Sequence, residues 1–150
     1  MKNNKKKSEQ NYALDEQVGF LLRRAYQRHT AIFQEHIPDQ HLTSAQFAVL
    51  VTTHKLGQAS LVQISHEAAI DHATLRDIVS RLKKRGLLKV EQSKQDRRQK
   101  LVSLMPEGEQ LLHETTPVAR QVTDITLSPL NECEQIAVLH ILQKLSHFEV

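Results

Sequence analysis

Residues 71–104 read DHATLRDIVSRLKKRGLLKVEQSKQDRRQKLVSL, and two periodicities follow one another in this segment. In its first half apolar residues lie three or four positions apart, which predicts a helix with one narrow apolar stripe. The stripe comprises Leu75, Ile78, Val79 and Leu82. Asp71 is a favourable N-cap for this helix, and Gly86 should end it. The second half alternates over 87–92 and 100–104 around the polar residues 93–99, so we expect a β-hairpin with a charged tip.

Two capping boxes precede this segment, and each predicts the start of a helix. Thr43 is followed three residues later by Gln46, and Ser60 by Gln63, so a hydroxyl and an amide can satisfy free backbone donors at each start. The residues predicted to face inward are Phe47, Leu50, Val51 and His54 in the first helix, and Leu61, Ile64 and Ala68 in the second. Short helices with a tight junction, followed by a hairpin, make residues 40–105 a winged helix-turn-helix domain.

The segments on either side, residues 12–37 and 106–150, are predicted to be helical and to form a dimerisation region. Apolar residues recur at helical spacing through 14–36, until Pro38 ends the helix. The last helix carries an apolar face broader than a small monomer needs, comprising Ile136, Leu139, Leu142, Leu145 and Phe148. The predicted fold class is therefore mainly α (α+β), a winged helix-turn-helix with a helical dimerisation domain.

Prolines predict the helix boundaries in the C-terminal segment. Pro106 suits the first turn of a fifth helix, and Ser128-Pro129 is expected to start a sixth helix in the same way. Pro117 falls in the middle of the fifth helix, where it removes one backbone hydrogen bond and should bend the helix.

Charge is distributed unevenly along the 150 residues, although the formal net charge is only +3 and the sequence pI is about 9.1. Residues 76–100 include 10 basic and 3 acidic residues, a local charge of +7, whereas residues 101–150 include 2 basic and 7 acidic residues. A basic segment of this density is what a polyanion-binding surface requires, because each neutralised phosphate releases counterions. The four lysines within residues 1–8 predict a disordered, solvated tail over residues 1–11.

Other classes of protein lack support in the sequence. No apolar run approaches the roughly 18 residues of a membrane span, and no apolar segment follows the N-terminal lysines, so we expect a cytoplasmic protein. The single Cys133 excludes an internal disulfide framework. There is no phosphate-binding glycine loop and no nucleophile elbow, so we predict neither catalytic residues nor a cofactor. The nine histidines do not show the spacing of a metal site, and no metal ligands are predicted.

The helix from Asp71 to Arg85 presents a polar face opposite its apolar stripe, which is typical of a helix that enters the major groove of DNA. Arg76 can pair with a guanine through two hydrogen bonds, and Thr74 can contact a thymine methyl or a phosphate. Asp77 can accept a hydrogen bond from cytosine or hold Arg76 in position. The predicted DNA-binding residues of this helix are His72, Thr74, Arg76, Asp77 and Ser80, together with Arg81 and Lys84 as phosphate contacts.

The predicted hairpin tip adds Asp96, Arg97 and Arg98 to these candidates. The carboxylate can brace a guanidinium, and arginines are long and flat enough to enter a narrow minor groove, whose negative potential attracts them. The alternative interpretation is an exposed polar helix face and a solvated turn, in a winged helix that serves only protein association.

Several of these stretches resemble the MarR family of winged-helix transcription regulators. The matching stretches are Leu42-Thr-Ser-Ala-Gln46, Asp71-His-Ala-Thr-Leu75, Val79-Ser-Arg-Leu82, Arg85-Gly-Leu-Leu88, Asp96-Arg-Arg98, Leu101-Val-Ser-Leu104 and Pro106-Glu-Gly108. The resemblance covers about residues 12–148. It implies a homodimer in which the first, fifth and sixth helices of both subunits interlock, with double-stranded DNA bound at adjacent major grooves. Met105 departs from the pattern, which usually has a Thr there to cap the fifth helix.

The resemblance also implies a small ligand in the crevice between the dimer helices and the winged domain. Residues 14–29 are similar to members that regulate the breakdown of nicotinic and related aromatic acids, which suggests a small aromatic carboxylate that releases a repressor from a palindromic operator. An apolar slot with one or two cationic or donor groups suits such a ligand. The candidate lining residues are Arg23, Tyr26, His29, Phe47, Val51 and His54. Because zinc sensing exists in this family, a zinc-responsive regulator of the same fold is a further alternative.

Overall fold

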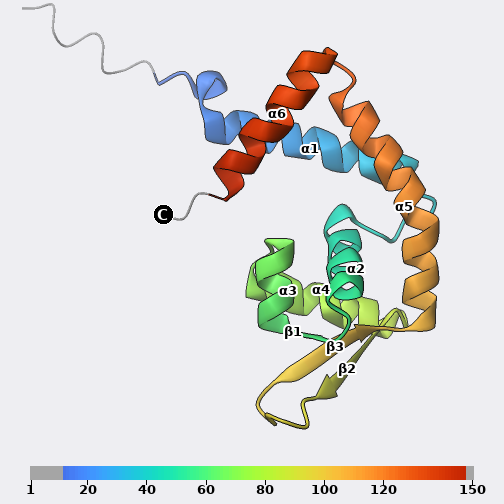
Figure 1. The fold of residues 1–150 in the computed structure, drawn as a ribbon. Coiled ribbons are helices and arrows are strands. Elements are labelled where there is room, and N and C mark those ends of the chain that lie inside the picture. Colours follow the sequence, from blue (N-terminus) through green and yellow to red (C-terminus); the bar gives the residue numbers. More distant parts are fainter. Residues whose placement is uncertain (1–11, 148–150) are drawn as a thin grey trace, which may run out of the picture.

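The computed structural model describes residues 12–147, which form six α-helices and a small antiparallel sheet (Figure 1). The elements in chain order are the 3-10 turn η1 (Leu14–Glu16), α1 (Val18–His36), α2 (Ser44–Leu56), β1 (Ala59–Ser60), α3 (Leu61–Ala68), α4 (His72–Lys84), β2 (Leu88–Gln92), β3 (Lys100–Leu104), α5 (Pro106–Leu127) and α6 (Glu132–Ser146). The mainly α fold predicted from the sequence is confirmed. The predicted tail over residues 1–11 and the predicted apolar contact of Phe148 lie outside the described residues.

The predicted N-caps form in the structure. In α2 the Thr43 hydroxyl accepts from the backbone N–H of Gln46 at 3.2 Å, and the Gln46 side chain accepts from the backbone N–H of Thr43 at 3.0 Å. The same exchange between Ser60 and Gln63 opens α3. The carboxylate of Asp71 accepts from the N–H of the third residue of α4 at 2.9 Å. These side chains satisfy backbone donors that a helix leaves without partners at its start.

The predicted start of the last helix is wrong. Ser128 and Pro129 belong to the connection after α5, and α6 begins only at Glu132. The reason is a third capping box: the Asn131 side chain accepts from the N–H of Glu134 at 3.0 Å, and the Glu134 carboxylate accepts from the N–H of Asn131 at 2.9 Å. The capping box satisfies two backbone N–H groups at Asn131, so the helix starts three residues later than the predicted start at Ser128.

Two other helix starts have no side-chain cap. Gln17 adopts an extended conformation and interrupts the helix predicted over 14–36, so that the short turn η1 precedes α1. Met105 is the N-cap residue of α5 and makes no side-chain capping bond, while Pro106 occupies the first turn as predicted. Pro117 lies inside α5, and Figure 1 shows this helix changing direction along its length.

The sheet has the strand order β1-β3-β2 and is antiparallel throughout. Strands β2 and β3 form the predicted hairpin, in a register that pairs Val90 with Val102. Strand β1 was not predicted, because a two-residue strand has no periodicity to recognise. It pairs Ala59 with Val102 and so ties the start of α3 to the hairpin.

The core lies between α2, α3, α4 and the sheet. The predicted apolar stripe of α4 is buried in full, and Leu75 and Leu82 have no exposed surface. They share the core with Leu50, Ile64 and Val102, which are also completely buried. Burial of this apolar surface is the main contribution to the stability of this part of the chain.

The inward face of α2 differs from the prediction. Val51 and His54 are exposed, whereas Val49, Thr52 and Thr53 are buried. Buried threonines are compatible with a core when their hydroxyls find an acceptor, and the Thr53 hydroxyl donates to the carbonyl oxygen of Val49 at 2.8 Å. The prediction treated the polar threonines as exposed, so the buried face of α2 lies about one position away from the predicted one.

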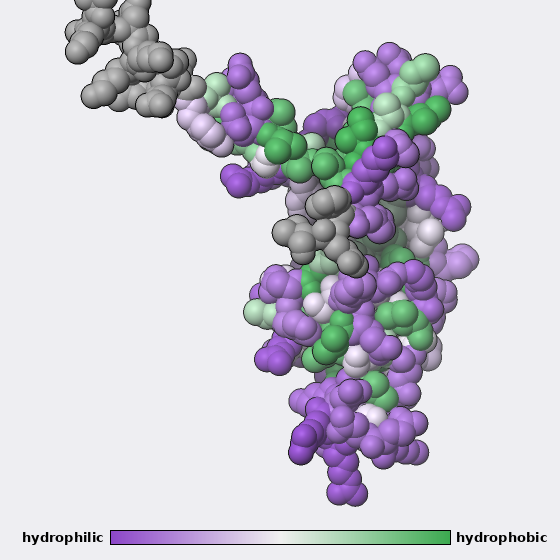
Figure 2. All heavy atoms as spheres, turned by 60° about the vertical axis from the view of Figure 1, so that its left-hand side comes forward, coloured by the Kyte–Doolittle hydropathy of each residue, from purple (hydrophilic) through white to green (hydrophobic). Residues whose placement is uncertain are grey.

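The core continues into α1 and α5 through Phe33, Leu112 and Val122, and these two helices pack against each other, whereas α6 buries none of its described residues. Arg28 of α1 donates to the carbonyl oxygens of Ile125 and Thr126 near the end of α5, at 3.3 and 2.6 Å. Large apolar side chains stay exposed on both outer helices: Val18, Leu21, Leu22 and Tyr26 on α1, and Ile136, Leu139, Ile141, Leu142 and Leu145 on α6. Figure 2 shows hydrophobic residues around α1 and α6 and mainly hydrophilic ones toward the hairpin.

Candidate nucleic-acid interface and ligand hollows

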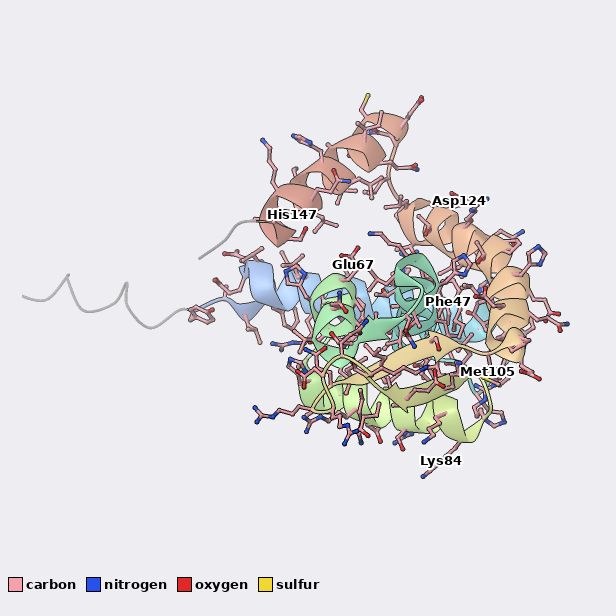
Figure 3. All side chains as sticks on the ribbon, turned by 60° about the horizontal axis from the view of Figure 1, so that its bottom comes forward. Phe47, Glu67, Lys84, Met105, Asp124 and His147 are labelled. Carbon is pink, nitrogen blue, oxygen red and sulfur yellow. The ribbon has the colours of Figure 1, made fainter. Side chains whose placement is uncertain are left out.

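Helix α4 buries its apolar face and exposes its polar face, as predicted from the sequence. The apolar stripe is buried, and the predicted DNA-binding residues of the helix are all exposed: His72, Thr74, Arg76, Asp77, Ser80, Arg81 and Lys84. Figure 3 shows Lys84 projecting away from the body of the protein. The structure pairs Asp77 with Arg81, at 2.9 Å between carboxylate oxygen and Nε, and not with Arg76 as expected. Residues four apart on a helix are direct neighbours, which explains the preference.

The hairpin tip is an ordered turn built around Ser93. This residue is only 5% exposed, and its hydroxyl accepts from the backbone N–H groups of Gln95 and Asp96, both at 3.2 Å. The Asp96 carboxylate accepts from the backbone N–H of Arg98 at 2.9 Å. Asp96 therefore braces the backbone of the turn, and the expected bond from this carboxylate to a guanidinium is not the one that forms. Arg97 and Arg98 are exposed.

A groove is lined by residues of both the hairpin and α4. Arg76 from α4 and Arg98 from the hairpin line it side by side with His72 and Ser80. Five further polar residues line the groove that were not predicted as DNA-binding residues: Ser60, Gln63, Lys83, Gln99 and Lys100. The two lysines belong to the basic segment noted in the sequence, but only the tertiary structure shows that both border the same groove as Arg76.

Two adjoining hollows lie where α2 meets the outer helices. The first, which we call the α1–α2 hollow, has a volume of about 660 Å³ and is lined by Tyr26, His29, Phe33, Ser44, Ala45, Phe47, Ala48, Val51, Thr52, Glu67, Ala68, Ala69, Ile70, Ala119 and Thr123. The second, the α2–α5 hollow, has a volume of about 690 Å³ and is lined by Phe47, Val51, His54, Glu109, Leu112, His113, Thr116, Pro117, Ala119, Arg120 and Thr123. Phe47, labelled in Figure 3, contributes to both.

The predicted ligand residues are divided between these hollows. Tyr26 and His29 line only the α1–α2 hollow, and His54 lines only the α2–α5 hollow. Arg23 lines neither hollow of this subunit. Arg120, which lines the α2–α5 hollow from α5, was not among the predicted ligand residues, because no local pattern distinguishes it.

Two histidines at the hollows have hydrogen-bond partners. The Nδ1 atom of His54 lies 2.8 Å from a carboxylate oxygen of Glu109, which joins α2 to α5. The Nδ1 atom of His29 lies 2.9 Å from the hydroxyl oxygen of Thr126, which joins α1 to α5. Within residues 12–147 no group of three or more His, Cys, Asp or Glu side chains could hold a metal ion.

A hydrogen bond from Lys55, together with its charge, lowers the pKa of the Glu67 carboxyl. Glu67 therefore carries a negative charge at neutral pH at the edge of the α1–α2 hollow. Across the part of the chain that the structure describes, no helix is both long and apolar enough to cross a membrane.

Comparison with known proteins identifies the family. The model of the MarR family matches residues 42–100, which include α2, α3, α4 and β2 and end at the first residue of β3. The transcriptional repressor NicR of Pseudomonas putida is 43% identical over 134 residues, covering 89% of this chain and 85% of NicR. The chain belongs to the MarR family.

Solved structures extend this likeness of the MarR-family chain to three dimensions. BpsR of Bordetella bronchiseptica, whose DNA binding is regulated by 6-hydroxynicotinic acid, matches with a TM-score of 0.86 at 48% identity, over 92% of this chain and 99% of BpsR. PcaV of Streptomyces coelicolor, in complex with its natural ligand, matches with a TM-score of 0.83 at 26% identity, over 91% of this chain and 96% of PcaV. Escherichia coli MarR bound to operator DNA, at 21% identity, shares the fold.

MarR-family membership confirms the predicted class of function. The chain is a transcription regulator and not an enzyme, since its relatives are regulators of transcription. The winged helix-turn-helix resemblance read from the sequence is confirmed as well. The roles of individual residues toward DNA and ligand stay predictions.

Proposed function

We propose that this MarR-family chain is a homodimeric repressor, released from a near-palindromic operator by a small aromatic carboxylate. One observation carries most of the proposal: Arg76 of α4 and Arg98 of the hairpin line the same groove. A single duplex can therefore meet a helix in its major groove and an arginine in its minor groove at once.

The polar face of α4 supports a division of roles among its residues. Thr74 and Arg76, in the first half of the helix, contact base edges, whereas Lys84 at its end contacts a phosphate. The ion pair with Asp77 restrains the Arg81 guanidinium, which favours a fixed phosphate contact over base reading. Arg97 and Arg98, on the ordered turn around Ser93, enter the minor groove.

The exposed apolar residues of α1 and α6 support the homodimer. A contiguous apolar surface of this kind marks an interaction site, because leaving it in water costs free energy. We assign residues 12–37 and 106–150 to dimerisation and residues 40–105 to DNA binding. Two-fold symmetry of the protein then requires a nearly palindromic operator, with half-sites about one helical turn apart.

The relatives support the chemical class of the effector. DNA binding by BpsR is regulated by 6-hydroxynicotinic acid, an aromatic carboxylate, and BpsR is 48% identical to this chain. The two hollows lie between α2 of the winged domain and helices of the dimerisation region, so a ligand there contacts both. It weakens DNA binding only if it binds the DNA-incompetent arrangement more tightly.

The test begins with genomic fragments selected by the pure protein, which provide the operator. Replacing both Arg76 and Arg98 by alanine should abolish operator binding in a fluorescence anisotropy titration, while light scattering still reports a dimer. The control variant replaces both Arg24 and Lys144 by alanine. These two residues are exposed on the outer helices, so the control loses the same charge, and its affinity for the operator should stay within about twofold of the wild type. Undiminished binding by the Arg76/Arg98 variant would favour a winged helix that serves protein association.

Salt dependence checks the same interface without mutation. Several phosphates are neutralised by each dimer, so the logarithm of the binding constant should fall steeply and linearly with the logarithm of the salt concentration. A flat response would contradict the role assigned to the basic segment.

A further inference from the structure

The least exposed ion pair among residues 12–147 joins Asp39 and Arg85, which lie 46 positions apart in the chain. Their side chains are 20% and 32% exposed, whereas the side chains of every other ion pair in that range are at least 36% exposed. The pair connects the loop after α1 to the end of α4. It therefore joins the dimerisation region to the helix that is assigned to the major groove.

Both partners start from backbone that the core holds in place. On one side Ile37 and Leu42, which stand close to Asp39 on either side of it, are almost completely buried. On the other side Leu82, three residues before Arg85, has no exposed surface. Two side chains on fixed backbone lose less entropy on pairing than two mobile ones, and this loss is one reason why most surface pairs are weak.

The side chains are also bound at more than one point. One oxygen of the Asp39 carboxylate accepts from the guanidinium of Arg85, and the other accepts from the backbone N–H of His41 at 2.9 Å. The guanidinium donates in addition to the carbonyl oxygen of His41 at 3.4 Å. Burial raises the pKa of Asp39, but these bonds and the charge of Arg85 lower it overall. The carboxylate is therefore ionised at neutral pH and balances the guanidinium charge.

Arg85 thus differs from other cations of the basic segment. Arg76 and Lys84 are exposed and form no ion pair with any residue among 12–147, so their charges are available to DNA. The charge of Arg85 is already balanced, but its location gives it another role. The chain turns at Gly86, with φ +74°, and enters the hairpin, so Arg85 lies at the joint between α4 and β2.

We propose that the pair of Asp39 and Arg85 is a positioning contact for operator recognition. It fixes the joint between α4 and the hairpin relative to the end of α1, and Arg85 itself does not bind DNA. The inference rests on the proposed function, because a dimer reads two half-sites only if its recognition helices keep a set distance. Since α1 belongs to the dimerisation region, loosening the pair loosens that distance in both subunits.

Asp39→Asn is a variant for which charge and positioning predict opposite results. It removes a negative charge, so its affinity for a random duplex should equal that of the wild type or exceed it. Its affinity for the operator should nevertheless fall about 3- to 30-fold in a fluorescence anisotropy titration, because α4 is no longer held.

A control variant accounts for lost stability. Ile64→Val removes a buried methylene from α3, far in sequence from the pair, and should bind the operator as the wild type does. An equal loss of operator affinity in Ile64→Val and Asp39→Asn would show that stability alone matters and would overturn the inference.

The double variant Asp39→Asn/Arg85→Gln tests whether the two residues act through each other. Removing either partner breaks the same contact, so the operator affinity of the double variant should lie within about twofold of that of Arg85→Gln. Independent losses that add up in the double variant would contradict a shared positioning role.

Salt dependence separates positioning from phosphate binding. Arg85→Gln should leave the slope of the logarithm of the binding constant against the logarithm of the salt concentration unchanged, because no phosphate contact is lost. Lys84→Gln, at the neighbouring residue assigned to a phosphate, should reduce the slope by about 0.9 for each subunit. A reduction of that size in Arg85→Gln would make Arg85 a phosphate contact and overturn the inference.

The outcomes distinguish this inference from the proposed function. If the wild type binds its operator and Asp39→Asn binds it equally well or more tightly, the positioning role is wrong and the proposed function stands. If the wild type binds no operator as a dimer, both are refuted.

Discussion

The winged domain and the outer helix α6 differ in where they place their large apolar side chains: the first buries them and the second leaves them exposed. Helix α4 turns its stripe inward, where Leu75 and Leu82 have no exposed surface. Helix α6 is of similar length and carries more large apolar residues, yet none of its described residues is buried, and Leu139 is 48% exposed. The core of the winged domain is complete within one chain, whereas the large apolar residues of α6 stay exposed in it, as expected if they pack against a second copy in the proposed homodimer.

Several contacts connect the regions, among them the His54–Glu109 bond between α2 and α5, and two others can be tested by substitution. Gly108, in the first turn of α5, lies against the backbone of Leu87, where the hairpin begins. Asp39, in the loop between α1 and α2, pairs with Arg85 at the end of α4. Mutations in the core, at these contacts and at a helix start should therefore have graded effects.

The largest effect is expected from Leu82→Ala in α4. It removes a completely buried side chain and leaves a cavity, which should lower the free energy of unfolding by about 3–4 kcal/mol. Leu142→Ala in α6 should leave the hydrogen-exchange protection of α4 unchanged and weaken the dimer in sedimentation experiments. If both variants lose equal protection in α4, the two regions fold as one unit and the contrast between them is wrong.

Gly108→Ala should come next. A Cβ atom at this position would lie 2.2 Å from the carbonyl oxygen of Leu87, so α5 must move away from the hairpin, at a cost of about 2–3 kcal/mol in chemical denaturation. Gly19→Ala in α1 is the matched control, because it meets nothing within 4 Å and should be neutral or slightly stabilising. Equal stability of the two variants would mean that α5 is not held against Leu87.

The ion pair between Asp39 and Arg85 should give a smaller, pH-dependent effect. Burial alone would raise the pKa of Asp39, but the hydrogen bond and charge of Arg85 and the N–H of His41 lower it overall, below its ordinary value of 3.8. The folded chain therefore prefers the ionised form of Asp39. The pair stabilises the fold fully at pH values above the ordinary pKa of 3.8, and this stabilisation is lost as the pH falls through the lowered pKa of the folded chain.

The variant Asp39→Asn should therefore cost about 1 kcal/mol at neutral pH and progressively less in acid, as measured by urea denaturation across the pH range. A cost that is independent of pH would show that the charge of Asp39 does not contribute.

The smallest effect is expected at the start of α5. Met105 is extended and offers no capping oxygen, so Met105→Thr should supply one and raise the free energy of unfolding by about 0.5–1 kcal/mol. Met105→Val has the shape of the threonine without its hydroxyl and should give no such gain in thermal unfolding. Equal behaviour of the two variants would exclude capping as the cause.

Local signals in the sequence predicted the winged domain well because each of them acts within a few residues. The boxes at Thr43 and Ser60 and the stripe of α4 depend only on spacing along one helix. The two wrong predictions, the start of α6 and the buried face of α2, also concern interactions within a few residues, where two local signals competed. Ser128-Pro129 was a plausible helix start, but the Asn131–Glu134 exchange satisfied more donors, and the burial of Thr53 depended on an acceptor in its own helix.

The sequence by itself determined that the chain folds as a winged helix-turn-helix with a basic face, because periodicity, caps and charge are properties of neighbouring residues. Only the tertiary structure brought Arg76 and Arg98 to one groove and distributed Glu67 and Arg120 between two hollows. These residues are separated by more than 20 positions in each pair, and no pattern along the chain specifies how far apart such residues lie in space. Packing of the helices around the shared core sets that distance.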